Sequence, residues 1–164
     1  MSLNAGSAAP DFTLTDQNGA PLHLAERIRQ HVIVLFFYPK DSSAGCTMEA
    51  CAFRDSYEAF QDAGAEVIGV SGGTTETKQQ FVRKNRLPFT LVTDADGAVA
   101  KAYGAEKQTG LMALAPQRAT FVIDRDGMIR HRFESRFSMN AHVTEALKIV
   151  QTLAREAANS TKAR

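Results

Sequence analysis

The amino-acid sequence predicts one α/β domain, with a mixed central sheet flanked by helices. Its 164 residues suit a single domain with one sizeable core. Short apolar runs typical of buried strands alternate with amphipathic segments typical of helices. Two hairpin signals, Asn18-Gly19 and Asp126-Gly127, each lie between candidate strands. The chain has no internal repeat and no linker composition, so residues 1–164 are expected to form one domain.

The first elements are a hairpin and a buried strand. Residues 12–14 and 22–24 flank Asn18-Gly19, a dipeptide favoured in type I′ turns. They predict a small N-terminal antiparallel β-hairpin. Residues 32–38 are apolar throughout and predict the first central strand.

A helix and a second strand are expected next. Residues 47–63 predict a helix whose buried stripe has the spacing i, i+4, i+7. Residues 66–71 predict a second buried strand, which ends at two glycines. The stripe of the helix consists of Phe53, Tyr57 and Phe60.

A second helix is predicted to begin at Thr74 or Thr75, either of which can serve as its N-cap. Its spacing buries Phe81. The same spacing is expected to present two basic side chains to water, those of Lys78 and Lys84.

The C-terminal half predicts a third strand at residues 88–92 and a short helix at residues 95–103. Residues 104–117 have no clean periodicity and predict a loop of functional length. Residues 119–123 and 128–133 flank the second hairpin signal and predict two more strands.

A final amphipathic helix is expected after its N-cap Ser138. Residues 1–7 and 158–164 are predicted to be poorly ordered. The resulting order is β-α-β-α-β, a β-hairpin and a helix, which is that of a thioredoxin-like fold. The predicted buried stripe of the final helix consists of Val143, Leu147, Val150 and either Leu153 or Ala154.

Composition and charge narrow the classes of function. The formal net charge of +1 gives no electrostatic reason to expect nucleic acid or an anionic membrane as a partner. No apolar run approaches the roughly 20 residues that a membrane span needs. The N-terminal segment lacks a basic stretch followed by an apolar one. Secretion is therefore not expected, and a cytoplasmic location is predicted.

Both cysteines of the chain, Cys46 and Cys51, follow the first central strand closely. A cysteine at a helix N-terminus favours the thiolate, because the unpaired amides and the helix dipole stabilise negative charge. A structural disulfide is not expected in a reducing compartment. The alternative interpretation is a pair of small buried hydrophobic side chains.

Helical geometry gives the two cysteines different surroundings. Cys46 lies within about 20° of Phe53 on a helical wheel, whereas Cys51 lies roughly 160° from it. The two Cα atoms would be about 8.6 Å apart, and a disulfide requires less than about 7 Å. If the two thiols react with each other, the first helical turn must therefore unwind.

This arrangement suits peroxide chemistry, in which a thiolate becomes a sulfenic acid and then condenses with a second thiol. The chain lacks the Cys-x-x-Cys motif of dithiol exchange enzymes. A zinc site is disfavoured too, since Cys-x4-Cys has no second ligand pair and the four histidines are scattered. Neither a metal nor an organic cofactor is predicted.

Three further residues are candidate partners of Cys46. Ser43 can hydrogen-bond a peroxide oxygen, or it can be a plain N-cap. Arg118 can lower the pKa of the thiolate and polarise a peroxide, whereas most arginines only solvate a surface. Glu49 is a secondary candidate, and its alternative role is to pair with the N-terminal amides as in a capping box.

The segment Pro39-x-x-x-Ser43-x-x-Cys46 resembles the active-site pattern Pro-x-x-x-Thr/Ser-x-x-Cys of the peroxiredoxins. Residues 37–55 are similar to the bacterioferritin comigratory protein, or peroxiredoxin Q, subfamily. The likeness extends from about residue 8 to about residue 155.

The resemblance implies a thioredoxin fold and the reduction of hydrogen peroxide and organic hydroperoxides. It identifies Cys46 with the peroxidatic cysteine and Cys51 with the resolving cysteine. The implied cycle passes through an intramolecular Cys46–Cys51 disulfide, which thioredoxin or a glutaredoxin-like dithiol donor would reduce. A monomer is expected, with a dimer as the alternative.

The resemblance also assigns the residues around the thiol. Arg118 matches the active-site arginine, and Glu49 matches a position that the subfamily usually fills with glutamate. Pro39 would shield the thiolate from water, and Ser43 would hold the peroxide oxygens. Ser43 stands where threonine is more usual, and Ala44 where proline is frequent, so the loop is expected to be looser than in other members.

Two other functions are compatible with the cysteine pair. One is a redox-sensing, partner-binding protein whose switch is the same disulfide, because unwinding of a helical turn would alter a docking surface. The other is a dithiol exchange enzyme. Steady peroxide turnover with a thioredoxin system distinguishes a peroxidase from a sensor, and insulin reduction without peroxide would favour the exchange enzyme.

Overall fold

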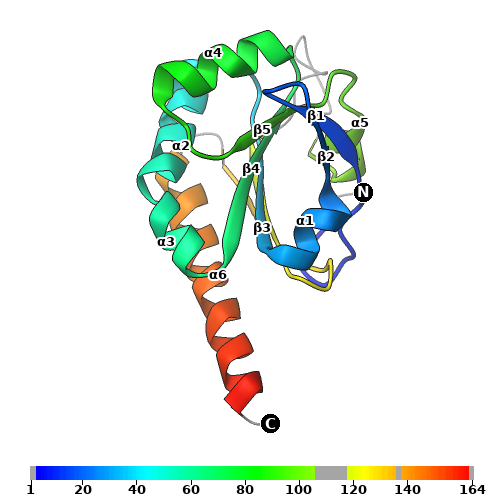
Figure 1. Cartoon of the computed structure of the whole chain (residues 1–164), viewed down its shortest axis with the longest axis vertical. Coiled ribbons are helices and arrows are strands. Elements are labelled where there is room, and N and C mark those ends of the chain that lie inside the picture. Colours follow the sequence, from blue (N-terminus) through cyan, green and yellow to red (C-terminus); the bar gives the residue numbers. More distant parts are fainter. Residues whose placement is uncertain (1–2, 106–117, 136–137, 163–164) are drawn as a thin grey trace.

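The computed structural model describes residues 3–105, 118–135 and 138–162. It contains a seven-stranded sheet with helices on both faces (Figure 1). The strands are β1 (Thr13–Asp16), β2 (Pro21–His23), β3 (Val32–Phe37), β4 (Ala65–Ser71), β5 (Thr90–Thr93), β6 (Ala119–Ile123) and β7 (Ile129–Glu134). The helices are α1 (Leu24–Gln30), α2 (Ala44–Asp55), α3 (Tyr57–Asp62), α4 (Thr75–Asn85), α5 (Ala98–Ala102) and α6 (Met139–Lys162).

The sheet is mixed, as the sequence predicts. Its strand order is β2-β1-β5-β4-β3-β6-β7, in which β3 pairs with β4 in parallel and with β6 antiparallel. All six residues of β3 are buried, because helices cover both faces of this central strand. Phe36 packs with α2, α3, α4 and α6 on one face, whereas Phe37 packs with α1 and α5 on the other.

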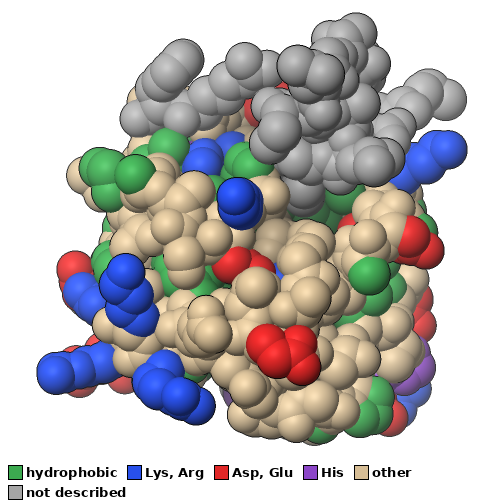
Figure 2. All heavy atoms as spheres, turned by 90° about the horizontal axis from the view of Figure 1, so that it is seen from above, with side chains coloured by type: hydrophobic (Ala, Val, Ile, Leu, Met, Phe, Trp, Pro, Cys, Tyr) green, Lys and Arg blue, Asp and Glu red, His purple; other side chains and the backbone are tan. Residues whose placement is uncertain are grey.

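The carboxyl ends of β3 and β4 lie side by side, since the two strands are parallel and in contact along their length. The loop after β3 leads into α2, and the loop after β4 leads into α4. Figure 2 views the molecule from the end where α4 lies and shows basic and acidic side chains mixed over the described part of this face. This end of the sheet is where ligands bind in open α/β folds.

Both predicted hairpins are present, but the predicted type I′ turn at Asn18-Gly19 is wrong. Gly19 and Gly127 both have φ near +80°, whereas the residues before them do not have positive φ. Each hairpin has a type I turn followed by a glycine in the left-handed region. In the first, the Asp16 carboxylate accepts hydrogen bonds from two backbone N–H groups of the loop, and Asp124 does the same in the second.

The helix predicted at residues 47–63 is two helices that begin earlier. α2 begins at Ala44, and the chain bends at Ser56 before α3. The bend leaves Tyr57 partly exposed, whereas Phe53 and Phe60 are fully buried as predicted. The earlier start places both cysteines inside one continuous helix.

Other boundaries differ less. Ser138 directly precedes α6, as predicted, and α6 continues to Lys162 (Figure 1). Most of the loop predicted at residues 104–117 lies outside the described residues. Within the described part of the chain, each helix is too short or too polar to span a bilayer.

The prediction that Lys78 faces water is wrong. Its side chain is completely buried, whereas Lys84 on the same helix is exposed as predicted. Burial is tolerated because the Lys78 ammonium pairs with Asp41, a residue of the loop after β3.

Candidate active site

Cys46 lies in the first turn of α2, directly beyond the end of β3. Its side chain is 1% exposed and packs in the apolar cluster on the α2 face of the sheet. The backbone N–H of Cys46 donates a hydrogen bond of 3.4 Å to the hydroxyl of Ser43, which is therefore the N-cap of α2. The thiol thus sits at the positive end of a helix dipole, as the sequence predicts.

Arg118 reaches Cys46 from the neighbouring strand. The antiparallel register pairs Phe37 with Ala119, so Arg118 lies opposite the residue that follows β3. Its Nη2 atom is 3.3 Å from the Cys46 Sγ atom, and its Nη1 atom donates to Oε1 of Glu49 at 3.0 Å. Burial alone would lower the pKa of Arg118, but Glu49 and Cys46 outweigh it and raise the pKa. The guanidinium stays charged and bridges a thiol and a carboxylate.

Glu49 is fully buried one turn after Cys46. Burial raises its pKa from 4.5 to about 7, although the Arg118 charge and hydrogen bond act in the opposite direction. Its Oε2 atom has no hydrogen-bond partner among the described residues. The carboxylate faces Arg118 rather than closing a capping box, so it has the contacts of a site residue.

His142 of α6 completes this cluster, and sequence reasoning did not single it out. Its Nδ1 atom is 3.6 Å from Glu49 Oε2 and 2.8 Å from the Thr120 hydroxyl. Its Nε2 atom donates to the Ser135 carbonyl at 2.8 Å, which fixes the hydrogen on this nitrogen. Burial lowers the pKa of His142, so the ring is neutral and Nδ1 accepts from Thr120. Its position next to the predicted stripe of the last helix is the signal that could have found it.

Gly45 allows the guanidinium to approach α2. A Cβ atom at this position would lie 3.2 Å from Nη2 of Arg118 and 3.2 Å from Cε of Met139. The absence of a side chain at Gly45 therefore leaves room for the Arg118 guanidinium.

Cys51 lies on another side of α2, as the helical wheel predicts. It is partly exposed, and its Sγ atom is 3.8 Å from Oδ1 of Asn85 at the end of α4. Arg54 donates to the Asn85 carbonyl at 2.7 Å and holds the same helix end against α2. Both cysteines are free thiols, and a continuous helix keeps their Cα atoms about 8.6 Å apart.

Pro39 is partly exposed at the start of the loop after β3. It lines a small cavity of about 120 Å³ together with Asp41, Gly73 and Thr77. The structure therefore brings Cys46, Ser43, Glu49 and Arg118 together, with Pro39 in the adjoining loop and Cys51 farther along the helix. In the described part of the chain, no three or more histidine, cysteine, aspartate or glutamate side chains gather as a metal site would require.

Comparisons with known proteins agree on one family. A model of the AhpC/TSA family matches residues 5–132. The chain is 43% identical over 151 residues to the chloroplastic peroxiredoxin Q of Oryza sativa subsp. japonica, which covers 92% of this chain and 68% of the rice protein.

Solved structures agree with this comparison. Peroxidoxin BcpB from Mycobacterium tuberculosis superposes with a TM-score of 0.86 at 36% identity, over 92% of this chain and 97% of that one. The bacterioferritin comigratory protein of Xanthomonas campestris, described for its alkyl peroxide reduction activity, superposes with a TM-score of 0.79 at 27% identity, over 87% and 92%. These likenesses confirm the thioredoxin-like fold predicted from the sequence.

The same comparisons correct one prediction. A cytoplasmic location was expected from the N-terminal sequence, and the plant relatives that the chain matches are named as chloroplastic proteins. The expectation was wrong because it rested only on the first residues of the chain, and relatives that share this domain are found in a plastid.

Proposed function

As a member of the AhpC/TSA family, the chain is a peroxiredoxin, and we propose that Cys46 is the thiol that attacks the peroxide. The observation that carries this proposal is the guanidinium of Arg118, 3.3 Å from the Cys46 sulfur at a helix N-terminus. A permanent positive charge and a helix dipole together stabilise a thiolate, which is the nucleophilic form of cysteine. The substrates would be hydrogen peroxide and organic hydroperoxides; the related Xanthomonas campestris protein is described as reducing alkyl peroxides.

The first chemical step is attack of the thiolate on one peroxide oxygen. An S–O bond forms as the O–O bond breaks, so that sulfur is oxidised to sulfenic acid and the peroxide is reduced. The departing hydroxide or alkoxide takes up a proton and leaves as water or alcohol. Arg118 can donate an N–H to the oxygen on which negative charge develops. The Ser43 hydroxyl accepts from the Cys46 amide, and its own hydrogen can be donated to a peroxide oxygen.

The second step joins the two cysteines. The Cys51 thiolate attacks the sulfur of the Cys46 sulfenic acid, a disulfide forms and water leaves. Because both cysteines lie in one continuous helix, the first turns of α2 must unwind before this step. A dithiol donor such as thioredoxin or a glutaredoxin-like protein then reduces the disulfide by thiol–disulfide exchange.

Mass spectrometry after one equivalent of hydrogen peroxide tests this cycle. The wild-type protein should lose two hydrogens, and the linked peptides should contain Cys46 and Cys51. Cys51→Ser should stop at the sulfenic acid after one turnover, whereas Cys46→Ser should consume no peroxide. Peroxide consumption by Cys46→Ser with thioredoxin supplied would refute the assignment.

Steady-state turnover separates the peroxidase from a redox sensor. A peroxidase sustains peroxide consumption with thioredoxin, its reductase and NADPH for many equivalents of enzyme. A sensor would form the same disulfide once and show little throughput.

A further inference from the structure

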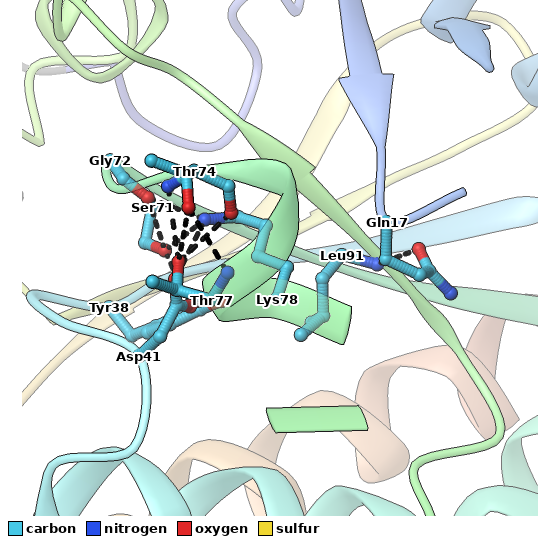
Figure 3. Close-up of polar contacts among 9 residues, drawn as sticks. All are labelled: Gln17, Tyr38, Asp41, Ser71, Gly72, Thr74, Thr77, Lys78 and Leu91. Carbon is cyan, nitrogen blue, oxygen red and sulfur yellow. Dashed lines mark hydrogen bonds and ion pairs between the residues drawn. The ribbon is translucent and has the colours of Figure 1, made fainter. Parts of the chain in front are cut away.

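A second buried ion pair lies at the carboxyl ends of β3 and β4 (Figure 3). The Lys78 side chain is 0% exposed. Its Nζ atom donates to Ser71 Oγ at 2.9 Å, to Asp41 Oδ2 at 3.1 Å and to the Gly72 carbonyl. An ammonium has three N–H donors, so each one has an acceptor.

The Asp41 carboxylate is satisfied to the same degree. Its Oδ1 atom accepts from the Tyr38 hydroxyl at 2.6 Å and from Ser71 Oγ at 3.1 Å. Its Oδ2 atom accepts from Thr77 Oγ1 at 2.7 Å and from Lys78. Burial, followed by the Asp41 charge, raises the pKa of Tyr38 well above its usual value, so the phenol stays a donor. Four groups, from β4, from α4 and from the residue after β3, therefore converge on one loop residue.

This arrangement is costly to maintain for stability alone. Burial lowers the pKa of Lys78, because a charge held away from water is unfavourable. The Asp41 charge acts in the opposite direction but does not cancel this effect. Apolar side chains of similar volume often replace buried ion pairs without loss of stability. What an ion pair with many hydrogen bonds supplies is a fixed position, because each donor and acceptor restricts direction as well as distance.

The position fixed here is that of the loop before Cys46. Asp41 lies two residues after Pro39 and two before Ser43, the N-cap of α2. The backbone N–H of Ser43 donates to the Lys40 carbonyl at 3.4 Å and closes a turn around Asp41 and Ser42. Ser42 has φ of +64°, a conformation that is strained for a residue other than glycine. A firmly held residue is thus followed at once by a strained one.

Gly73 leaves the space that the ion pair occupies. Its φ is +85°, and a Cβ atom would lie 3.0 Å from Asp41 Oδ2 and 3.0 Å from Thr77 Oγ1. Any side chain at this position would push against the carboxylate.

We infer that Asp41 and Lys78 are positioning residues for the oxidation of Cys46, in that they anchor the loop that presents Pro39 and Ser43 to the peroxide. Ser42 then marks the hinge at which the anchored loop gives way to the part of α2 that unwinds. This inference rests on the proposed peroxidase function. It separates the two chemical steps: oxidation needs the anchored loop, whereas disulfide formation needs α2 to unwind beyond it.

Rapid-mixing kinetics with hydrogen peroxide test the inference on Lys78→Met, with Lys84→Met as the matched control on the exposed face of the same helix. For folded Lys78→Met, the rate constant of Cys46 oxidation should fall about tenfold, because small displacements of positioning groups have large effects on rate. The rate of disulfide formation from the sulfenic acid should not fall. Lys84→Met should match the wild type in both steps.

A milder variant covers the case in which Lys78→Met does not fold. Ser71→Ala removes the hydroxyl that contacts both Lys78 and Asp41, and it should slow oxidation in the same direction by a smaller factor. Oxidation within twofold of the wild type in the folded variants would overturn the inference. Slowing of both steps in proportion to the unfolded fraction would also overturn it, since that result indicates stability alone.

Amide hydrogen exchange distinguishes failure of this inference from failure of the proposed function. If peroxide does not oxidise Cys46 in the wild type, the peroxidase assignment fails. The anchor can still be judged in that case, because Lys78→Met should accelerate exchange in residues 39–46 relative to Lys84→Met. Equal exchange in the two variants would refute the anchor irrespective of activity.

Discussion

Two buried charge clusters lie beyond the carboxyl end of β3, and they differ in how well their polar groups are satisfied. The Asp41–Lys78 cluster has an acceptor for each ammonium hydrogen and donors on both carboxylate oxygens. In the Cys46–Arg118 cluster, Glu49 keeps one oxygen without a hydrogen-bond partner among the described residues, and its pKa is raised to about 7.

The difference indicates that the two clusters have different functions, although Asp41 and Cys46 lie only a few residues apart in the chain. A satisfied cluster has one preferred geometry and resists movement. An incompletely satisfied cluster has no single geometry fixed by its hydrogen bonds, and this one contains a group that changes charge near neutral pH. The first suits an anchor and the second suits chemistry.

The largest expected effect comes from removing the guanidinium of the Cys46–Arg118 cluster, which we call the reactive cluster. Arg118→Met keeps much of the side-chain volume but removes the donor beside Cys46 and the partner of Glu49. The rate constant of Cys46 oxidation by hydrogen peroxide should fall by at least about 100-fold, because stabilisation of developing charge is lost. Stopped-flow measurement on the folded variant checks this value.

Arg125→Met is the matched control, since Arg125 is exposed in the turn between β6 and β7. Its oxidation rate should stay within about twofold of the wild type. If Arg118→Met oxidised as fast as this control, the reactive cluster would have no chemical function and the contrast with the Asp41–Lys78 cluster would disappear.

The sequence predicts only part of the two clusters, because their contacts depend on the pairing of strands that lie far apart in the chain. The strands, the hairpins and the placement of Cys46 and Ser43 follow from local signals. Arg118 was one candidate among several from its place before a strand, and the resemblance strengthened it. Its approach to Cys46 depends on the register of β6 against β3, which local signals do not give. His142 lies beside the predicted buried stripe of the last helix, which indicates burial, but spacing does not show that its ring faces Glu49.

Lys78 is a residue that the sequence placed wrongly for the same reason, because its partner is distant in the chain. Helical periodicity assigns a lysine to the solvent face, because a charge is rarely buried. The partner that reverses this assignment, Asp41, lies 37 residues earlier in the loop after another strand. Only the parallel pairing of β3 and β4 brings the two loops together, and the sequence predicted both strands without predicting this contact.

The next largest effect is a change of protein stability with pH that is caused by the titration of Glu49. This carboxyl titrates at about 7 in the folded protein, against an ordinary value of 4.5. Between these pH values the folded state holds a proton that the unfolded state has released. The free energy of unfolding should therefore fall as pH rises from about 4.5 to about 7, by up to about 3 kcal/mol from this group.

Urea unfolding of Glu49→Gln over this pH range checks the prediction. Glutamine does not titrate, so the stability of the wild type relative to Glu49→Gln should decline as pH rises. Glu156→Gln is the control, because Glu156 is an exposed carboxylate paired with Arg130 and should leave the slope in place. An unchanged slope in Glu49→Gln would assign the titration to another group.

The smallest effect uses two glycines, each of which makes room for one cluster. Gly45→Ala adds a methyl group 3.2 Å from Arg118 Nη2 at a helical position, where alanine is favoured by about 0.5–1 kcal/mol. Gly73→Ala adds one 3.0 Å from Asp41 Oδ2 at φ of +85°, which is strained and should cost about 1–3 kcal/mol.

Gly45→Ala should therefore slow Cys46 oxidation about three- to tenfold by displacing the guanidinium, while its melting temperature stays equal to or above that of the wild type. Gly73→Ala should lower the melting temperature clearly. Stopped-flow rates and thermal unfolding of both variants decide the matter. Suppose instead that Gly45→Ala lowered the melting temperature and left the rate of Cys46 oxidation unchanged. The methyl group would then have disturbed packing rather than the approach of Arg118 to the sulfur. In that case the reactive cluster would be a second structural anchor.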